Sequence, residues 1–296
     1  MPLGENISIY LDDGSVTGIR HGQIMGWTGQ AIACPRNRIG DLGKWEEAKR
    51  PGVYFLFGPD ENTGGLAAYI GEAENVLIRL QQHLSSKDFW TEAIFLTSKD
   101  ETLTSAHAKY LESKFITAAL GSRRYQLENG NEPQLPSLPR AERAVMEKFI
   151  GYTRILLGTL GHKILEPILG TLPQESQLGI SKPISPIGNR ELFLNVAGLS
   201  AKGVQTNEGI VVLEGSDASR NIGKGLSDGY QKLRETLIRE GILIDGTQNL
   251  YFKSNQLFNS PSAAASVIVG TAMNGPRNWK DARGRSINEI ESEIAG

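Results

Sequence analysis

The chain has 296 residues, of which 39% are hydrophobic and 22% are charged, and its formal net charge is −2 at pH 7. This composition excludes a disordered protein, and the near-neutral charge excludes the strongly basic class of non-specific nucleic-acid coat proteins. The length exceeds that of one average domain, so we expect about two or three domains.

The cysteine content and the hydrophobic pattern point to a reducing compartment away from membranes. Cys34 is the single cysteine, which excludes an intrachain disulfide. No apolar run reaches the length of about 18 residues that predicts a membrane span. The N-terminus lacks the basic start and apolar core of a secretory signal. We therefore expect a cytoplasmic protein with no membrane partner.

The N-terminal residues 1–48 contain two short stretches that alternate apolar and polar residues. Asp12-Asp13-Gly14 lies between such stretches and is a hairpin turn signal. We expect residues 1–48 to form a small β-rich appendage.

Residues 49–132 show the periodicity of a compact mixed α/β unit. The expected elements, in chain order, are strands at 53–57 and 67–70, a helix at 74–84, a strand at 92–98 and a helix at 103–120. Thr104 is placed to cap the second helix at its start, and Gly121 is placed to end it. The pattern predicts a small three-stranded sheet with flanking helices.

The second half of the chain is divided by stretches rich in proline, glycine and serine. Residues 133–187 are expected to form a linker and a helical connector. Residues 188–296 mix strand-like runs with a helix near 227–240, and Ser260-Pro261 is a typical helix start. The chain as a whole is therefore predicted to have the α+β class, with a C-terminal α+β accessory domain.

Two tripeptides lie on the consecutive strands expected in residues 49–132. They are Gly52-Val53-Tyr54 and Tyr69-Ile70-Gly71. Either tripeptide alone is typical of an ordinary strand with a tyrosine on one face. Arg79 follows about two turns into the next helix, and His83 lies one turn later on the same helix face.

Two further polar residues complete an ordered set. Glu112 lies in the middle of the following helix, and Asn129 lies soon after that helix ends. The set resembles the GIY-YIG nuclease superfamily over about residues 50–132, with valine in place of the isoleucine of the first tripeptide. The loop between the tripeptides, 58–65, is longer than the family often has. The resemblance implies a hydrolase, a metal-dependent DNA endonuclease.

The residue types suit the hydrolysis of a phosphodiester, which requires water activation, transition-state stabilisation and neutralisation of the leaving oxygen. Glu112 is a hard oxygen ligand for one Mg²⁺ or Mn²⁺ ion, with phosphate oxygens and waters completing the coordination. Arg79 offers a planar fork to phosphate oxygens. The resemblance implies that Tyr54 is the general base or the group that orients the water.

The other members of the set have supporting roles. Tyr69 is expected to hold the water or the phosphate, and Asn129 the phosphate or the glutamate. His83 is a candidate base or proton relay, because the pKa of an ordinary histidine is near neutrality. Each residue alone also has a structural interpretation, such as a solvated helix arginine or a core tyrosine.

A basic segment near the C-terminus is a candidate nucleic-acid surface. Its four cations surround one aromatic residue, as expected for phosphate contacts and base stacking: Arg277, Trp279, Lys280, Arg283 and Arg285. The alternative is a surface loop anchored by a buried tryptophan. This end of the chain also resembles a domain of unknown function that accompanies GIY-YIG and restriction-type nucleases, which implies an accessory or targeting role.

The function expected from these features is DNA cleavage, with restriction of foreign DNA in genome defence as the favoured process. DNA repair or mobile-element processing is the second choice, and a non-catalytic or partner-dependent nucleic-acid-binding protein is the competing class. The expected partners are DNA, a restriction or defence protein, and a second copy of the chain. The second copy follows because one single-metal site cuts one strand at a time.

Overall fold

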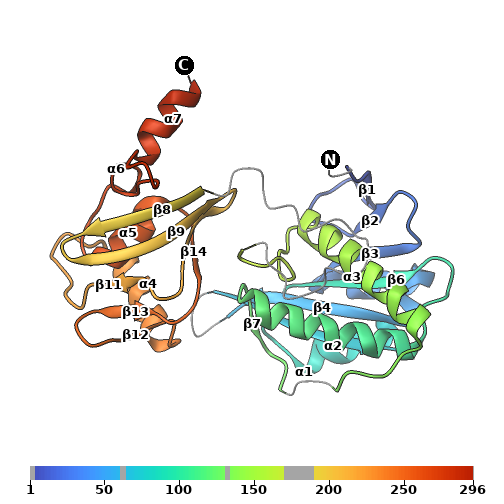
Figure 1. Cartoon of the computed structure of the whole chain (residues 1–296). Coiled ribbons are helices and arrows are strands. Elements are labelled where there is room, and N and C mark those ends of the chain that lie inside the picture. Colours follow the sequence, from blue (N-terminus) through green and yellow to red (C-terminus); the bar gives the residue numbers. More distant parts are fainter. Residues whose placement is uncertain (1–3, 61–64, 131–133, 170–189, 296) are drawn as a thin grey trace. The chain divides into compact units, whose positions relative to one another are not determined.

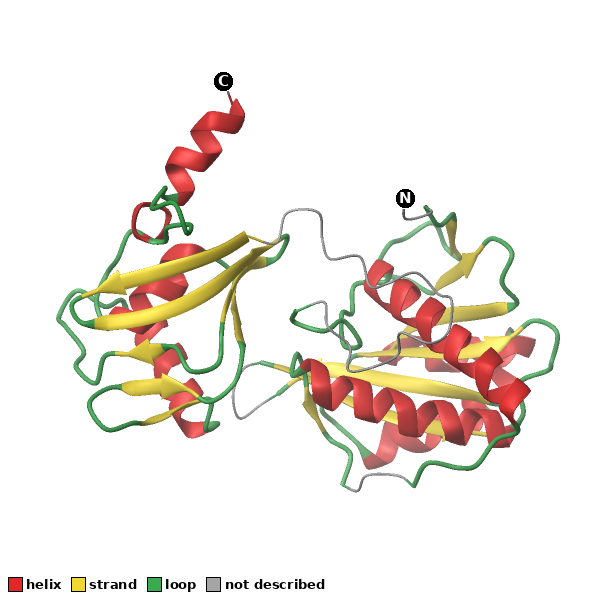
Figure 2. Cartoon of the chain, viewed as in Figure 1, coloured by secondary structure: helices red, strands yellow, loops and turns green. Residues whose placement is uncertain are grey.

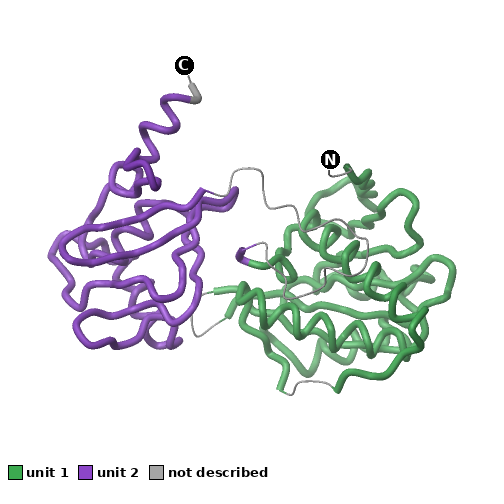
Figure 3. Tube along the Cα trace, viewed as in Figure 1, with its two compact units in different colours: residues 1–167, 172–181 green, residues 168–171, 182–296 purple. Residues whose placement is uncertain are grey.

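The computed structural model describes residues 4–60, 65–130, 134–169 and 190–295. The chain divides into two compact units, which Figure 3 shows in two colours. Unit 1 comprises residues 1–167 and 172–181, and unit 2 comprises residues 168–171 and 182–296. Both units combine helices with sheets (Figure 2), which confirms the predicted α+β class.

Unit 1 is built on one seven-stranded sheet, in the order β1-β2-β3-β6-β4-β5-β7. Its neighbouring strands are antiparallel except for the parallel pair β5 and β7. The strands are β1 (Ile7–Leu11), β2 (Arg20–Ile24), β3 (Gly29–Pro35), β4 (Gly52–Pro59), β5 (Leu66–Ala73), β6 (Glu92–Ser98) and β7 (Gln126–Leu127). The three strands predicted for residues 49–132 are β4, β5 and β6, at the centre of a larger sheet.

The first 48 residues belong to this same sheet. Residues 12–19, which begin with the turn at Asp12-Asp13-Gly14, join β1 to β2 in an antiparallel hairpin. Strand β3 pairs with β6 along its whole length, from Gly29 opposite Ser98 to Pro35 opposite Glu92. The boundary that the sequence suggested at residue 48 therefore falls between strands of one sheet, and the N-terminal strands extend the sheet that carries the two tripeptides.

Helices cover both faces of the sheet (Figure 1). Helices α2 (Ser105–Ser122) and α3 (Arg140–Thr159) contribute to a core with Phe55 and Phe57 of β4. On the other face, α1 (Val76–Ser86) and the 3-10 segments η1 (Arg36–Lys44) and η2 (Glu46–Lys49) pack on a core that contains Tyr54 and Leu56. Alternate residues of β4 thus point to opposite faces, as strand geometry requires.

The ends of α2 differ in part from the prediction. The side chain of Thr104 accepts a hydrogen bond from the His107 backbone, so its predicted capping role is confirmed. The predicted stop at Gly121 is wrong, because the helix continues to Ser122. Arg123 ends it instead, with a φ of 52° in the left-handed region, where glycine is the usual but not the required residue.

Unit 2 has two small sheets and its own core. One sheet has the order β14-β10-β9-β8 and the other β11-β13-β12. The strands are β8 (Arg190–Val196), β9 (Leu199–Thr206), β10 (Gly209–Val212), β11 (Asp217–Ala218), β12 (Leu243–Asp245), β13 (Leu250–Phe252) and β14 (Gln256–Phe258); the helices are α4 (Asp228–Arg239), α5 (Pro261–Val269), α6 (Gly275–Asn278) and α7 (Ile287–Ala295). Ser260 caps α5 as predicted, with proline in its first turn. Across the described residues of both units, no helix combines the length and the apolar character needed to cross a membrane.

Candidate active site

The two tyrosines of the tripeptides lie on the face of the sheet that α1 covers. In the register of β4 and β5, Tyr54 is opposite Gly71 and Leu56 is opposite Tyr69. Directly opposed residues point to the same face, so both tyrosine side chains project toward α1. Their ring centroids are 6.2 Å apart, and each ring lies 5.4 Å from the imidazole of His83.

The glycines of the tripeptides provide space for neighbouring groups and do not form turns. Strand β5 continues through Gly71 to Ala73, so the chain does not turn there. A Cβ atom on Gly71 would lie 2.2 Å from the Tyr54 hydroxyl oxygen. At Gly52, a Cβ atom would lie 2.4 Å from the Leu96 carbonyl oxygen of β6. Glycine at 71 lets the Tyr54 ring lie across β5, and glycine at 52 lets β4 approach β6.

Helix α1 presents Arg79 and His83 to the tyrosines. The side chain of Asn75 caps the helix by accepting a hydrogen bond from the Ile78 backbone, and Leu80 packs into the core. Arg79 Nε donates to the Tyr54 hydroxyl over 3.3 Å, and the hydroxyl lies 2.8 Å from His83 Nε2. The structure therefore brings these three predicted site residues into one hydrogen-bonded group.

The direction of each hydrogen bond in this group follows from the available donors. Ser86 Oγ donates its proton to the Gln82 carbonyl, so it accepts from His83 Nδ1, 3.3 Å away. With its proton on Nδ1, the neutral ring has Nε2 free to accept the Tyr54 proton. The Tyr54 oxygen also accepts from Arg79, which can only donate. The sequence analysis missed Ser86; its spacing of three residues from His83 on a helix was the available signal.

Burial sets the protonation states of Tyr54 and His83. The Tyr54 side chain is fully buried, and this burial raises the pKa of its hydroxyl well above 10. Burial, together with the Arg79 and Lys87 charges, lowers the pKa of His83 to about 4. At neutral pH the tyrosine is therefore protonated, and the imidazole is neutral and able to accept its proton.

Glu112 lies on α2, which packs on the opposite face of the sheet from α1. Burial, aided by the Glu72 carboxylate, raises the pKa of Glu112 to about 7. The Glu72 backbone N–H and the charges of Arg79 and Lys109 act in the opposite direction. Arg79 thus lies within electrostatic reach of Glu112. Glu72 is a second carboxylate that the sequence analysis missed, although it follows directly on the second tripeptide.

The donor set around Glu112 suits a metal that is completed by the substrate. Among the described residues, no group of three or more histidine, cysteine, aspartate or glutamate side chains is arranged to hold a metal ion. Mg²⁺ is usually bound by one or two carboxylates, with waters and substrate phosphates in the remaining positions. A half-buried carboxylate with a raised pKa and a second carboxylate beside it fit this mode, because a cation would offset the cost of burying the charge.

Asn129 has a different role from the predicted contact with phosphate or glutamate. Its side-chain oxygen accepts from the Ile70 N–H over 3.1 Å, and its nitrogen donates to the Ile70 carbonyl over 2.7 Å. The amide thereby continues the pairing of β7 with the exposed edge of β5. Because its oxygen and nitrogen both serve this backbone, Asn129 positions the strand of Tyr69 and Gly71.

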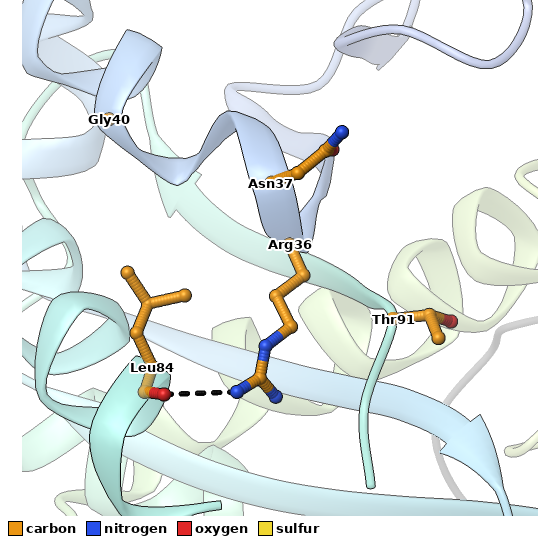
Figure 4. A pocket seen from close by; sticks show the side chains of 5 residues that line it. All are labelled: Arg36, Asn37, Gly40, Leu84 and Thr91. Atoms are coloured by element: carbon orange, nitrogen blue, oxygen red, sulfur yellow. Dashed lines mark hydrogen bonds between the residues drawn. The ribbon is translucent and has the colours of Figure 1, made fainter. Parts of the chain in front are cut away.

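Arg36, from the N-terminal residues, holds the end of α1 (Figure 4). Its guanidinium donates to the Leu84 carbonyl over 2.9 Å and to the Lys87 carbonyl over 2.7 Å. It also stacks on the Trp90 ring at 4.6 Å from the centroid. A cation at a helix C-terminus is favourable. The shallow hollow around Arg36 is lined by none of the predicted site residues.

The basic segment of unit 2 contains a structural tryptophan. Trp279 is fully buried, and its Nε1 donates to the Pro261 carbonyl over 3.1 Å. The predicted stacking of Trp279 on a base is therefore wrong, because the indole fills the core. Arg285 is paired with Asp281 and with Glu293. The remaining predicted cations, Arg277, Lys280 and Arg283, are exposed.

The comparisons with known proteins concern unit 2. Residues 192–291 match the family described as Domain of unknown function (DUF4357). This confirms the predicted resemblance of the C-terminal region to a domain of unknown function, and no match to the GIY-YIG family was found. Neither the curated proteins nor the solved structures gave a match. Trp279 and its surrounding cations lie inside the DUF4357 region.

Proposed function

We propose that unit 1 is a GIY-YIG-type nuclease that hydrolyses phosphodiester bonds of DNA with one divalent metal ion. The observation that supports this most is the convergence of Tyr54, Arg79 and His83 in one hydrogen-bonded group, with the Glu112 carboxylate within electrostatic reach of Arg79. These residues come from a strand and two helices. An unrelated set of surface and core residues has no reason to meet in this way.

Arg79 would bind the scissile phosphate and uncover Tyr54. In the free protein the Tyr54 hydroxyl is buried and bonded to Arg79. A phosphate diester attracts the guanidinium, which can form two parallel hydrogen bonds with its oxygens. Movement of Arg79 toward the phosphate frees a lone pair of the Tyr54 oxygen for the attacking water.

Tyr54 and His83 would then move the proton. The Tyr54 pKa is too high for a stable tyrosinate at neutral pH, so the hydroxyl acts as a relay. Its oxygen takes a proton from the water while its own proton passes to His83 Nε2, 2.8 Å away. The bound phosphate adds negative charge beside the imidazole, which raises its low pKa and strengthens it as the proton acceptor.

Glu112 would hold the metal ion, assisted by Glu72. Mg²⁺ or Mn²⁺, when bound, withdraws negative charge from the phosphate and from the leaving oxygen. Ser86 keeps His83 in the tautomer whose Nε2 can accept, and Asn129 keeps β5 in place. Tyr69 lines the same face and borders the space available to the substrate strand.

We propose restriction of foreign DNA as the biological process, on the strength of the sequence resemblance described above. Repair or mobile-element processing would use the same chemistry. A second copy of the chain, or a restriction or defence protein, would supply the second cut of a duplex. Sedimentation of the protein on DNA tests this, and a lone monomer making concerted double-strand cuts would rule it out.

A non-catalytic or partner-dependent nucleic-acid-binding protein is the competing function. One observation favours it: the Tyr54 hydroxyl is fully buried, so water cannot contact it until Arg79 moves. Such a protein would bind nucleic acid through Arg79 and never expose the relay, or would do so only when a partner protein is bound.

The deciding experiment is a cleavage assay on plasmid, single-stranded DNA and RNA with Mg²⁺ or Mn²⁺. The wild type is compared with Arg79→Ala and Glu112→Ala, and with Arg239→Ala in α4 as a matched exposed arginine. We expect metal-dependent DNA cuts that the first two variants lose and the control keeps. Cuts that persist in both site variants would contradict the site, and binding without any cleavage would favour the competing function.

A further inference from the structure

Lys87 extends the line of polar residues that α1 presents to the tyrosines. It follows the last residue of the helix, and its N–H donates to the His83 carbonyl. Arg79 and His83 lie four residues apart on one side of α1, and Lys87 follows four residues later as the extended residue that ends the helix. The sequence analysis assigned roles to the first two and none to the third.

The Lys87 ammonium lies on the Tyr69 ring. Its Nζ is 4.2 Å from the ring centroid. An aromatic face attracts a cation without neutralising its charge, so the ammonium keeps its ability to bind an anion. Tyr69 therefore places a positive charge at the border of the proposed active site, beside the group formed by Tyr54 and His83.

Neither Lys87 nor Arg79 forms an ion pair with a carboxylate in the part of the chain that the structure describes. The acidic neighbour Asp88 pairs with Arg36 instead, at 3.2 Å. The two cations thus flank His83 and repel its protonated form. Unpaired like charges on one side of a short helix are unfavourable for folding alone, and a polyanion would relieve the repulsion.

We infer that Lys87 binds a backbone phosphate next to the scissile one, on the Tyr69 side of the site. This inference rests on the proposed nuclease function. Arg79 contacts the Tyr54 hydroxyl and Lys87 lies on the Tyr69 ring, so the two cations can bind different phosphates of one strand. Lys87 then helps to fix the path of the strand past Tyr54, and Arg36 holds the Lys87 backbone through its carbonyl.

The salt dependence of DNA binding tests this. Binding of a labelled duplex is measured by anisotropy in EDTA, between about 50 and 200 mM salt, for wild type, Lys87→Gln, Lys87→Arg and Lys99→Gln. Lys99 is a matched lysine of unit 1 that contacts Gln23, away from the site. We expect Lys87→Gln to lower the slope of log K against log salt by about 0.9. Lys87→Arg and Lys99→Gln keep the wild-type slope.

A slope that is unchanged in Lys87→Gln would overturn the inference. A second measurement checks the placement without DNA: the NMR titration of His83 should move to higher pH in Lys87→Gln, because one neighbouring positive charge is gone. Metal-dependent cleavage by the wild type is scored separately. Wild-type cleavage with an unchanged slope overturns only this inference. A lowered slope without any cleavage supports Lys87 as a phosphate contact and overturns the nuclease assignment.

Discussion

The site on α1 in unit 1 and the basic segment of unit 2 show what the same residue types do in different settings. Both combine a buried aromatic residue with neighbouring cations. In unit 1 the buried Tyr54 bonds to Arg79 and His83, which are themselves side chains without carboxylate partners among the described residues. In unit 2 the buried Trp279 bonds to a backbone carbonyl, and Arg285 is neutralised by two carboxylates.

The difference lies in what the polar atoms contact. A polar group that is satisfied by the backbone or by an opposite charge stabilises the fold and has little left for a ligand. Polar groups that contact one another and leave a net charge unpaired are available to bind a charged ligand. This difference supports the proposed function of the site in unit 1 and a structural role for Trp279 in unit 2.

The largest effect on stability is expected at Trp279. Trp279→Ala should lower the free energy of unfolding of unit 2 by about 3–5 kcal/mol, because it removes a fully buried side chain and leaves a cavity. Urea denaturation measures this. Arg283→Ala, at an exposed neighbour, should change it by less than about 0.5 kcal/mol. If Trp279→Ala had near-normal stability but lost DNA binding, Trp279 would be a surface residue that contacts nucleic acid.

A substitution at Glu112 should have the opposite effect and raise the free energy of unfolding. Its pKa in the fold is about 7, above the ordinary value of 4.5, so the folded protein binds more protons between these values and loses stability as pH rises through them. Glu112→Gln should therefore raise the free energy of unfolding at pH 8 in EDTA by roughly 1–3 kcal/mol. Glu147→Gln is the matched control and should lower it, because Glu147 accepts from Tyr110 and pairs with Lys114. A destabilised Glu112→Gln variant would indicate a structural glutamate.

Alanine substitutions at two glycines of unit 1 distinguish a steric effect on packing from an effect on backbone flexibility. Gly71→Ala should lower the free energy of unfolding by about 1–3 kcal/mol and impair cleavage, since its Cβ would collide with the Tyr54 hydroxyl. Gly121→Ala, within α2 and with nothing near its Cβ position, should raise stability by about 0.5–1 kcal/mol. Thermal or denaturant unfolding distinguishes them. Equal effects at both sites would mean that Tyr54 does not lie across Gly71.

The smallest and most local effect is the titration of His83. Its NMR signal should titrate near pH 4 in the free protein. Because this pKa is lowered, the folded protein binds fewer protons than the unfolded chain, so the His83 contribution to stability falls as pH drops from about 6.5 toward 4. A His83 pKa near 6.5 would mean that the imidazole is exposed and not held by Tyr54 and Ser86.

The sequence predicted the local elements and most of the site better than the wider arrangement. Strand β6 has the predicted bounds, and the order of Tyr54, Tyr69, Arg79, His83 and Glu112 was readable because each lies at a regular position of a strand or helix. The pairing of β3 with β6 could not be predicted from the sequence, because contacts between residues about 60 positions apart leave no local pattern. Asn129 shows the same limit, because its partners are backbone atoms of Ile70 that only the folded chain brings near. Ser86 and Glu72 differ, since each lies at a short spacing from a predicted site residue.

The most direct test of the proposed nuclease site is the single-turnover rate of DNA cleavage by Glu112→Gln with Mn²⁺, in a preparation whose stability is verified at the same pH. The site predicts a rate at least about 100-fold below wild type in a protein that is as stable as wild type or more so. Glu147→Gln should cleave normally once folded. A Glu112→Gln rate within about threefold of wild type would contradict the assignment of Glu112, and with it the proposed active site.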